Sequence, residues 1–182
     1  MTSVRWSPEN GKGIEHLDLD TREPTIVIES VLIGERTECD HGFIYRIECD
    51  AQWRVTRVII KRAGGVTLEL LADTHGNWSD GNGRPHDDLK GCIDIDISAT
   101  PFTNTLPIRR LNLGKNERRV IPVVYIALPA MTTKRVEQAY TCIEPDRLYR
   151  YEGITTQYTA DLPVDGDGLV IDYPGLFRRL VD

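Results

Sequence analysis

Two aspartates, Asp94 and Asp96, stand two residues apart in the segment GCIDIDIS at residues 91–98. In an extended strand alternate side chains share a face, so both carboxyl groups point the same way, about 6.5–7 Å apart. Two carboxylic acids at this separation can act as the acid and base of a sugar or ester hydrolase if their pKa values differ. The pattern is equally typical of the solvated outer face of a sheet, and both interpretations stay open.

The next segment, ATPFTNTLPIRRL at residues 99–111, carries two adjacent arginines, Arg109 and Arg110. We expect it to lead into a strand, in which neighbouring side chains point to opposite faces, so one arginine lies inside. A buried guanidinium requires a carboxylate partner or several other acceptors, and the candidate carboxylates are Glu29, Asp94 and Asp96. The arginine either forms an internal ion pair or anchors the polar head of a ligand, together with the polar run Thr103, Asn104 and Thr105.

Trp78 is the aromatic residue that most suggests a binding surface. It follows Gly76 and Asn77 and precedes the polar, glycine-rich segment 79–91, where its ring could cover a sugar or an acyl chain. Core packing is the alternative, as for any tryptophan of a β-rich protein.

Metal binding is not predicted. The histidines show no spacing typical of metal ligands; they are His16, His41, His75 and His86. The sequence DGDG at 165–168 does not fit a calcium loop, because Pro163 and Pro174 would occupy its first and twelfth positions. We expect a hairpin turn there, with neither a metal nor another cofactor.

Period-two alternation dominates the chain and indicates an all-β or strongly β-dominated fold. The segment 133–140 could be a strand or a short helix, and 174–181 is expected to be a short C-terminal helix with Pro174 at its first position. The predicted strands cover residues 15–20, 25–33, 43–48, 53–61, 66–72, 92–98, 123–128, 147–152 and 169–173.

A weak internal repeat suggests how these strands assemble. GIEHLDLD at 13–20 resembles GCIDIDIS at 91–98, and IESVLIGER at 28–36 aligns with IRRLNLGKN at 108–116. We predict one domain over 1–182, built from two antiparallel meanders at about 13–80 and 91–173 that form a partly open barrel or sandwich. In the first copy, alternation places Glu15 on the same face as Leu17 and Leu19.

The amino-acid composition argues against some classes of binding partner. The net charge of −6 and the pI of about 5.3 argue against nucleic acid or an anionic membrane, since both require a basic face. No apolar run reaches the roughly 18 residues of a membrane span, and no signal segment is evident, so we expect a cytoplasmic protein. We expect reduced, mostly buried thiols at Cys39, Cys49, Cys92 and Cys142.

Several motifs together resemble a known family. They are GCIDIDISATPFTNTLPIRRL, Trp6, QWRVTRV, HGNW and DGDGLVIDYPGLF, and nearly the whole chain resembles the bacterial "putative glycolipid-binding" protein family. The resemblance implies a β-rich fold similar to the half-open barrels of bacterial lipoprotein carriers, with a cavity for an amphiphile. A carrier of that kind acts outside the cytoplasm, which the absence of an evident export signal does not favour.

The leading hypothesis is therefore a protein that binds a small amphiphile, such as a glycolipid, rather than an enzyme. Polar residues would hold the head group: Thr103, Asn104, Thr105, Arg109, Arg110, Asp94, Asp96 and Trp78. Apolar residues would hold the chain: Ile59, Leu68, Leu70 and Val124. The alternatives are a hydrolase that uses Asp94 or Asp96 and a structural domain without a ligand. Which strand faces line the cavity, and the oligomeric state, stay open.

Overall fold

The computed structural model describes residues 1–22, 24–36 and 39–180, which form two β-sheets and little helix. The larger sheet contains, in spatial order, β13 (Asp172–Tyr173), β14 (Phe177–Arg179), β1 (Thr2–Pro8), β2 (Gly13–Asp20), β3 (Ile26–Arg36), β4 (Cys39–Cys49), β5 (Val55–Arg62), β6 (Thr67–Ala72) and β7 (Trp78–Asp80). The smaller sheet contains β12 (Tyr158–Pro163), β11 (Leu148–Gly153), β10 (Thr132–Glu144), β9 (Arg118–Ala127) and β8 (Asp94–Ile97).

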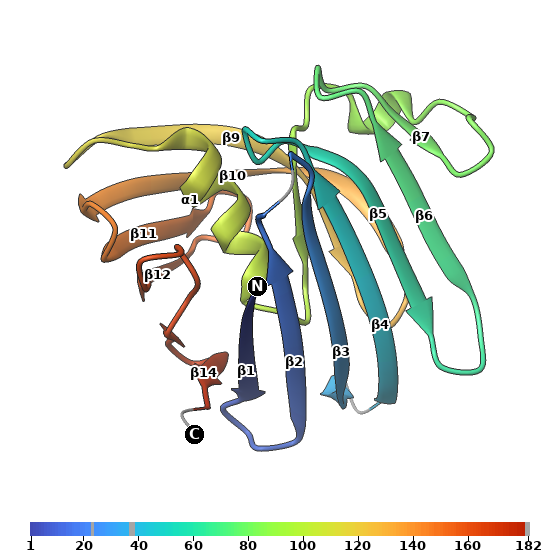
Figure 1. Ribbon diagram of the computed structural model, residues 1–182, viewed down its shortest axis with the longest axis horizontal. Coiled ribbons are helices and arrows are strands. Elements are labelled where there is room, and N and C mark those ends of the chain that lie inside the picture. Colours follow the sequence, from blue (N-terminus) through green and yellow to red (C-terminus); the bar gives the residue numbers. More distant parts are fainter. Residues whose placement is uncertain (23, 37–38, 181–182) are drawn as a thin grey trace.

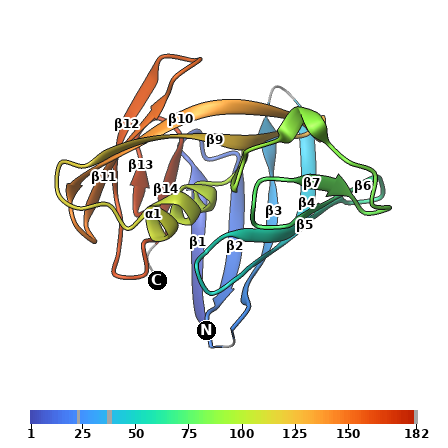
Figure 2. The same ribbon diagram turned by 90° about the horizontal axis from the view of Figure 1, so that it is seen from above.

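Both sheets curve, and the smaller one closes over the larger one (Figures 1 and 2). Strands β1 to β7 form an antiparallel meander, whereas β8 pairs in parallel with β9. The connection from β8 to β9 runs through η2 (Phe102–Asn104) and α1 (Thr105–Leu111), with α1 lying between the two sheets. A third short helix, η1 (Asp87–Leu89), follows β7. The prediction of a β-dominated, partly open barrel or sandwich is confirmed.

Alternation sorts most side chains as the sequence predicts. On β2, Leu17 and Leu19 are buried together with Glu15, whereas His16 is exposed. The segment 133–140 lies within β10 and is therefore a strand. Ile59 does not face inward as expected: its neighbours Val58 and Ile60 occupy the buried face of β5, because the register of that strand places them there.

The segment 99–111 was expected to be extended, and it is helical instead. Pro107 lies in the first turn of α1, where its missing N–H is tolerated. Arg109 and Arg110 lie in the last turn, where the helix dipole favours cations, and Asn112 ends the helix with a left-handed φ of 45°. The aligned segments 28–36 and 108–116 thus differ, since the first lies in β3 and the second starts inside α1. Duplication stays a prediction.

The predicted C-terminal helix is wrong. Residues 173–176 form a turn in which the N–H of Leu176 donates to the carbonyl of Tyr173 at 2.9 Å. Pro174 followed by Gly175, with φ of 78°, matches the two central positions of a type II turn. The chain then reverses into β14, which pairs with β13 and β1.

Two hydrophobic clusters fill the interior. One lies between the larger sheet, β8, β9 and Leu106 of α1, and the other lies between the smaller sheet, Ile108 of α1 and the C-terminal strands. Free thiols are buried at Cys49, Cys92 and Cys142, where burial raises the thiol pKa. The side chain of Cys39 lies outside the described side chains. No helix in the described ranges has the length and apolar character required to cross a bilayer.

Candidate functional site

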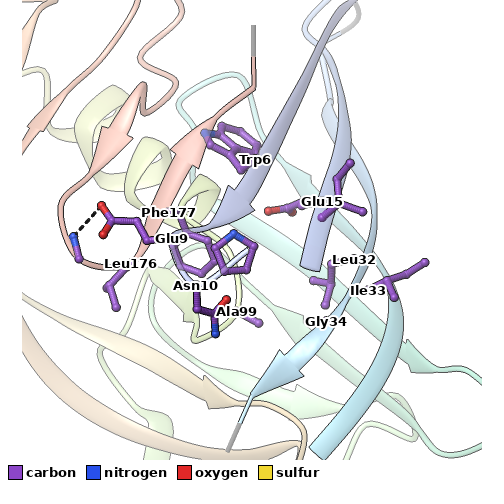
Figure 3. A pocket seen from close by; sticks show the side chains of 13 residues that line it. Trp6, Glu9, Asn10, Glu15, Leu32, Ile33, Gly34, Ala99, Leu176 and Phe177 are labelled. Atoms are coloured by element: carbon purple, nitrogen blue, oxygen red, sulfur yellow. Dashed lines mark hydrogen bonds between the residues drawn. The ribbon is translucent and has the colours of Figure 1, made fainter. Parts of the chain in front are cut away.

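A surface pocket of about 230 Å³ lies where β1, β2 and β3 approach the turn between β13 and β14 (Figure 3). Both ends of the chain build it, because β14 pairs with β1. We call it the Glu15 pocket. Its lining is mostly apolar and comprises Trp6, Pro8, Ile14, Leu32, Ile33, Ala99, Leu176 and Phe177, with Glu9, Asn10, Glu15, Gly34 and Gly175.

Glu15 is the unusual member of this lining, since it is only 4% exposed. Its Oε1 accepts hydrogen bonds from the hydroxyls of Ser30 at 2.8 Å and Tyr45 at 2.7 Å. Its Oε2 is buried and has no hydrogen-bond partner among the described residues. Figure 3 shows the side chain directed from β2 toward Trp6 and Phe177. A buried polar atom without a partner costs about 1–3 kcal/mol, so this oxygen is a position that a ligand can satisfy.

Burial also changes the protonation of this group. It raises the pKa of Glu15 to about 7, although the nearby hydroxyls of Tyr45, Thr100 and Ser30 lower it in part. Burial and the Glu15 charge raise the pKa of Tyr45 well above its ordinary value, so Tyr45 stays a hydrogen-bond donor. Near neutral pH the Glu15 carboxyl can therefore either accept a hydrogen bond through Oε2 or donate one.

The aromatic wall of the pocket is fixed by its neighbours. Trp6 is fully buried, and its Nε1 donates to the carbonyl of Val170 at 2.8 Å. The guanidinium of Arg179 lies 5.7 Å from the centroid of the Trp6 ring, a cation–π contact. These two contacts fix the position of the Trp6 ring.

The two turns at the pocket rim are tied together. The N–H of Glu9 donates to the carbonyl of Leu176 at 3.0 Å. In return the N–H of Gly175 donates to Oε1 of Glu9 at 3.0 Å (Figure 3). These contacts hold the turn after β1 against the turn after β13 and so preserve the shape of the rim.

Asp94 and Arg110, both predicted site residues, form an internal ion pair. Arg110 Nε donates to Asp94 Oδ1 at 2.9 Å, and Nη2 donates to Oδ2 at 2.6 Å. The Asp94 side chain is fully buried and that of Arg110 is 18% exposed. Burial raises the pKa of Asp94, and Arg110 opposes that rise. The inward arginine is therefore Arg110.

Thr103, Asn104 and Thr105 are buried as well, at 1%, 5% and 0% exposure. Asn104 donates from Nδ2 to the carbonyl of Pro101 at 3.0 Å and accepts from the hydroxyl of Tyr140 at 2.9 Å. Thr105 donates to the carbonyl of Gly168 at 2.8 Å. These groups join η2 and α1 to the surrounding strands, and none of the three lines the Glu15 pocket.

Two further predicted residues lie apart from this pocket. Arg109 is exposed on α1, with its guanidinium 5.5 Å from the ring centroid of Trp53. Trp78 is 3% exposed, and its Nε1 donates to the carbonyl of Cys92 at 2.8 Å. Leu68, Leu70 and Val124 pack in the first hydrophobic cluster instead of lining the Glu15 pocket. Ligand binding by these residues stays a prediction.

Four of the predicted residues line cavities other than the Glu15 pocket. Arg109 and Arg110 line one of about 360 Å³, and Trp78 lines one of about 400 Å³. Asp96 is partly exposed and lines another, a hollow of about 150 Å³ on the smaller sheet. The hydrolase hypothesis receives no support from this placement, because Asp94 is fully buried against Arg110 while Asp96 opens to the surface. A polar cleft in which Asp94, Asp96 and His16 converge would favour a hydrolase, but His16 lies on the exposed face of β2.

Among the described residues, no group of three or more His, Cys, Asp or Glu side chains is arranged to hold a metal ion.

The sequence interpretation did not select Glu15 as a site residue, although the necessary signal was present. A carboxylate on the same strand face as Leu17 and Leu19 must be buried, and a buried carboxylate marks either a structural pair or a site.

Comparison with known proteins agrees with this fold. No curated protein matches the chain. A crystal structure of a DUF1089 family protein from Pseudomonas aeruginosa is similar, with a TM-score of 0.82 and 40% sequence identity. The similarity covers 91% of this chain and 92% of that one. The sequence model of the family described as "Putative glycolipid-binding" matches residues 3–179. The chain belongs to this family.

Proposed function

We propose that the protein binds a small amphiphile, with an apolar segment in the Glu15 pocket and a hydrogen bond to Glu15 Oε2. The observation that carries the proposal is the buried, unpartnered oxygen of Glu15 in an apolar pocket. Binding sites commonly combine apolar walls with a few placed polar groups. The family description names the same kind of ligand.

The size of the pocket limits how much of the ligand it encloses. Its volume of about 230 Å³ lies below the roughly 300–1,000 Å³ of sites for drug-sized molecules. The pocket therefore holds one alkyl segment rather than a whole glycolipid. At its rim Ile14 and Ile33 face each other across β2 and β3 and are 44% and 59% exposed. This apolar rim supports a chain that continues beyond the pocket.

The chemistry of Glu15 favours a ligand with a hydroxyl or amide next to its chain. A neutral partner can pair with the carboxyl in either protonation state, because Oε2 accepts when ionised and donates when protonated. Burying each methylene of the chain contributes about 0.8 kcal/mol. A chain of several carbons thus supplies most of the affinity, and Glu15 fixes its orientation.

The test is a titration of ¹⁵N-labelled protein with n-octyl β-D-glucopyranoside below its micelle concentration, followed by amide NMR shifts. Gly34 and Gly175, which line the pocket, should shift, and methyl β-D-glucopyranoside should leave them unchanged. Ala99→Leu, which fills the pocket, and Glu15→Gln should each weaken binding. Ala63→Leu is the matched control, because Ala63 is exposed and does not line the pocket.

Two results would overturn the proposal. One is the absence of shifts at Gly34 and Gly175. The other is binding of octyl glucoside that neither Ala99→Leu nor Glu15→Gln weakens. If Ala99→Leu does not fold, Glu15→Gln still decides, since it preserves the shape of the side chain.

A further inference from the structure

A second cavity, of about 150 Å³, lies on the face of the smaller sheet that carries Asp96. The strand register places Asp96 beside Tyr125 and Tyr125 beside Lys134, so three adjacent strands contribute to one floor. The other lining residues are Val136, Glu137, Gln138, Tyr151, Gly153, Thr155 and Thr156. We call it the Asp96 pocket. It combines an apolar floor with hydrogen-bond donors and hydrogen-bond acceptors around it.

The carboxylate of Asp96 is held from behind by buried groups. Gln138, 3% exposed, donates from Nε2 to Oδ2 at 2.6 Å. Thr103, 1% exposed, donates from its hydroxyl to Oδ1 at 3.3 Å. The network continues through Tyr140, whose hydroxyl contacts Gln138 Oε1 at 3.5 Å and donates to Asn104 Oδ1 at 2.9 Å. An acceptor fixed in this way loses little freedom when it binds a ligand.

Lys134 supplies a donor on the same floor. Its Nζ lies 5.4 Å from the centroid of the Tyr125 ring, a contact that holds the ammonium group over the sheet. The pocket thus presents a carboxylate acceptor and an ammonium donor on neighbouring strands. A hydroxyl both donates and accepts, so a molecule with several hydroxyls can use both groups at once.

We infer that the Asp96 pocket binds a saccharide ring, with hydroxyls donating to Asp96 and accepting from Lys134 while the apolar face of the ring lies on Val136 and Tyr151. A volume equal to about five waters at roughly 30 Å³ each holds one ring that remains partly exposed. Thr103 and Gln138 are positioning residues that act through Asp96. The inference goes beyond the proposed function, because it concerns another cavity and requires no ligand in the Glu15 pocket.

A series of neighbouring aromatic rings links the walls of the two cavities. Phe177, which lines the Glu15 pocket, lies 6.5 Å from Tyr173 between ring centroids. Tyr173 in turn lies 6.1 Å from Tyr151, which lines the Asp96 pocket. The ring of Tyr173 thus contacts a wall of each pocket.

The test uses methyl glycosides without an alkyl tail, namely methyl β-D-glucopyranoside, β-D-galactopyranoside and α-D-mannopyranoside, at tens of millimolar. At least one should shift the amides of Gly153, Thr155 and Thr156 and leave Gly34 unchanged. Asp96→Asn should weaken that binding about tenfold or more, since it removes a charge-assisted hydrogen bond. Asp161→Asn is the matched control, because Asp161 pairs with Arg150 on an exposed part of the same sheet.

The role of Thr103 in positioning Asp96 is tested separately, through saccharide affinity. Thr103→Val should reduce saccharide affinity in protein that is still folded, and Thr103→Ser should restore it. The inference is overturned if no methyl glycoside shifts Gly153, Thr155 or Thr156, or if Asp96→Asn binds as well as the parent. These outcomes differ from failure at the Glu15 pocket, which is read from octyl glucoside and from Gly34 and Gly175.

Discussion

Arg110 and Asp94 form a two-point ion pair from α1 to β8, with the carboxylate fully buried. The pair lies where η2 and α1 connect β8 to its parallel neighbour β9. It therefore fixes the helix to the edge strand of the smaller sheet, and the segment 99–111 is in large part a structural connection.

Arg110→Met should destabilise the protein by about 3–5 kcal/mol, because it leaves a buried carboxylate without its partner. The double variant Arg110→Met/Asp94→Leu should cost less than this single change, since no uncompensated charge remains. Urea denaturation measures both. Arg109→Met is the control and should cost about 1 kcal/mol or less, the value of an exposed cation–π contact. Equal losses for Arg109→Met and Arg110→Met would contradict the structural role of the pair.

The buried Glu15 carboxyl should make stability depend on pH. Its pKa rises from 4.5 to about 7 on folding, so the folded state retains a proton that the unfolded chain releases. The resulting stabilisation is complete below pH 4.5 and is lost as pH rises through 7. Between pH 5 and 8, parent protein should lose about 2.5 kcal/mol relative to Glu15→Gln.

Chemical denaturation of both proteins at several pH values measures this difference. Glu29→Gln is the control, because the Glu29 side chain is 62% exposed and its removal should leave the pH profile unchanged. A constant difference between parent and Glu15→Gln across this range would show that Glu15 is ionised normally.

Tyr45→Phe tests the hydrogen bond behind Glu15. Because the Tyr45 hydroxyl lowers the pKa of Glu15, its removal should raise that pKa further above 7. It should also cost about 1–2 kcal/mol, the value of a hydrogen bond to a group that can be charged. A ¹³C NMR titration of the Glu15 carboxyl measures the shift. Tyr149→Phe, on the smaller sheet, should not alter it, and a lowered pKa in Tyr45→Phe would be inconsistent with the network.

Gly13→Ala should disturb the rim of the Glu15 pocket. A Cβ at Gly13 would lie 2.6 Å from the carbonyl oxygen of Ile33, a backbone atom that cannot move aside without shifting β3. We expect a loss of about 1–3 kcal/mol, typical of overpacking, and weaker binding of octyl glucoside. Gly42→Ala is the matched control, since its Cβ would meet only the Cβ of Ala63 at 3.7 Å. Calorimetry and the NMR titration together decide.

Much of the sheet architecture could be predicted, because alternation reports directly on which strand faces are buried. The position of Glu15 beside Leu17 and Leu19 followed from this rule alone. Short or edge strands such as β1, β7 and β12 were not predicted. Their pairing depends on partners distant in sequence, and local pattern does not record those partners.

The segment 99–111 shows why other parts of the fold were harder to predict from the sequence. Pro107, the two arginines and Asn112 are each helix signals, but alignment with a strand of the first meander outweighed them. At 174–179, Pro174 and Gly175 fit either the start of a helix or a type II turn. The choice between them is made by pairing of β14 with β1, at the other end of the sequence. The Glu15 pocket escaped prediction for the same reason, since its walls meet only after folding.

The residues that line the Glu15 pocket are also synthesised at different times. Trp6 and Pro8 leave the ribosome early, whereas Leu176 and Phe177 emerge after strands β1 to β12. Because nascent chains fold from the N-terminal side, β1 waits at the edge of a nearly complete sheet until β14 arrives. Until then Trp6 lacks the carbonyl of Val170 and the guanidinium of Arg179. The Glu15 pocket, which we propose as the ligand site, is thus completed last, and stalled or clipped chains would keep most of the strands without it.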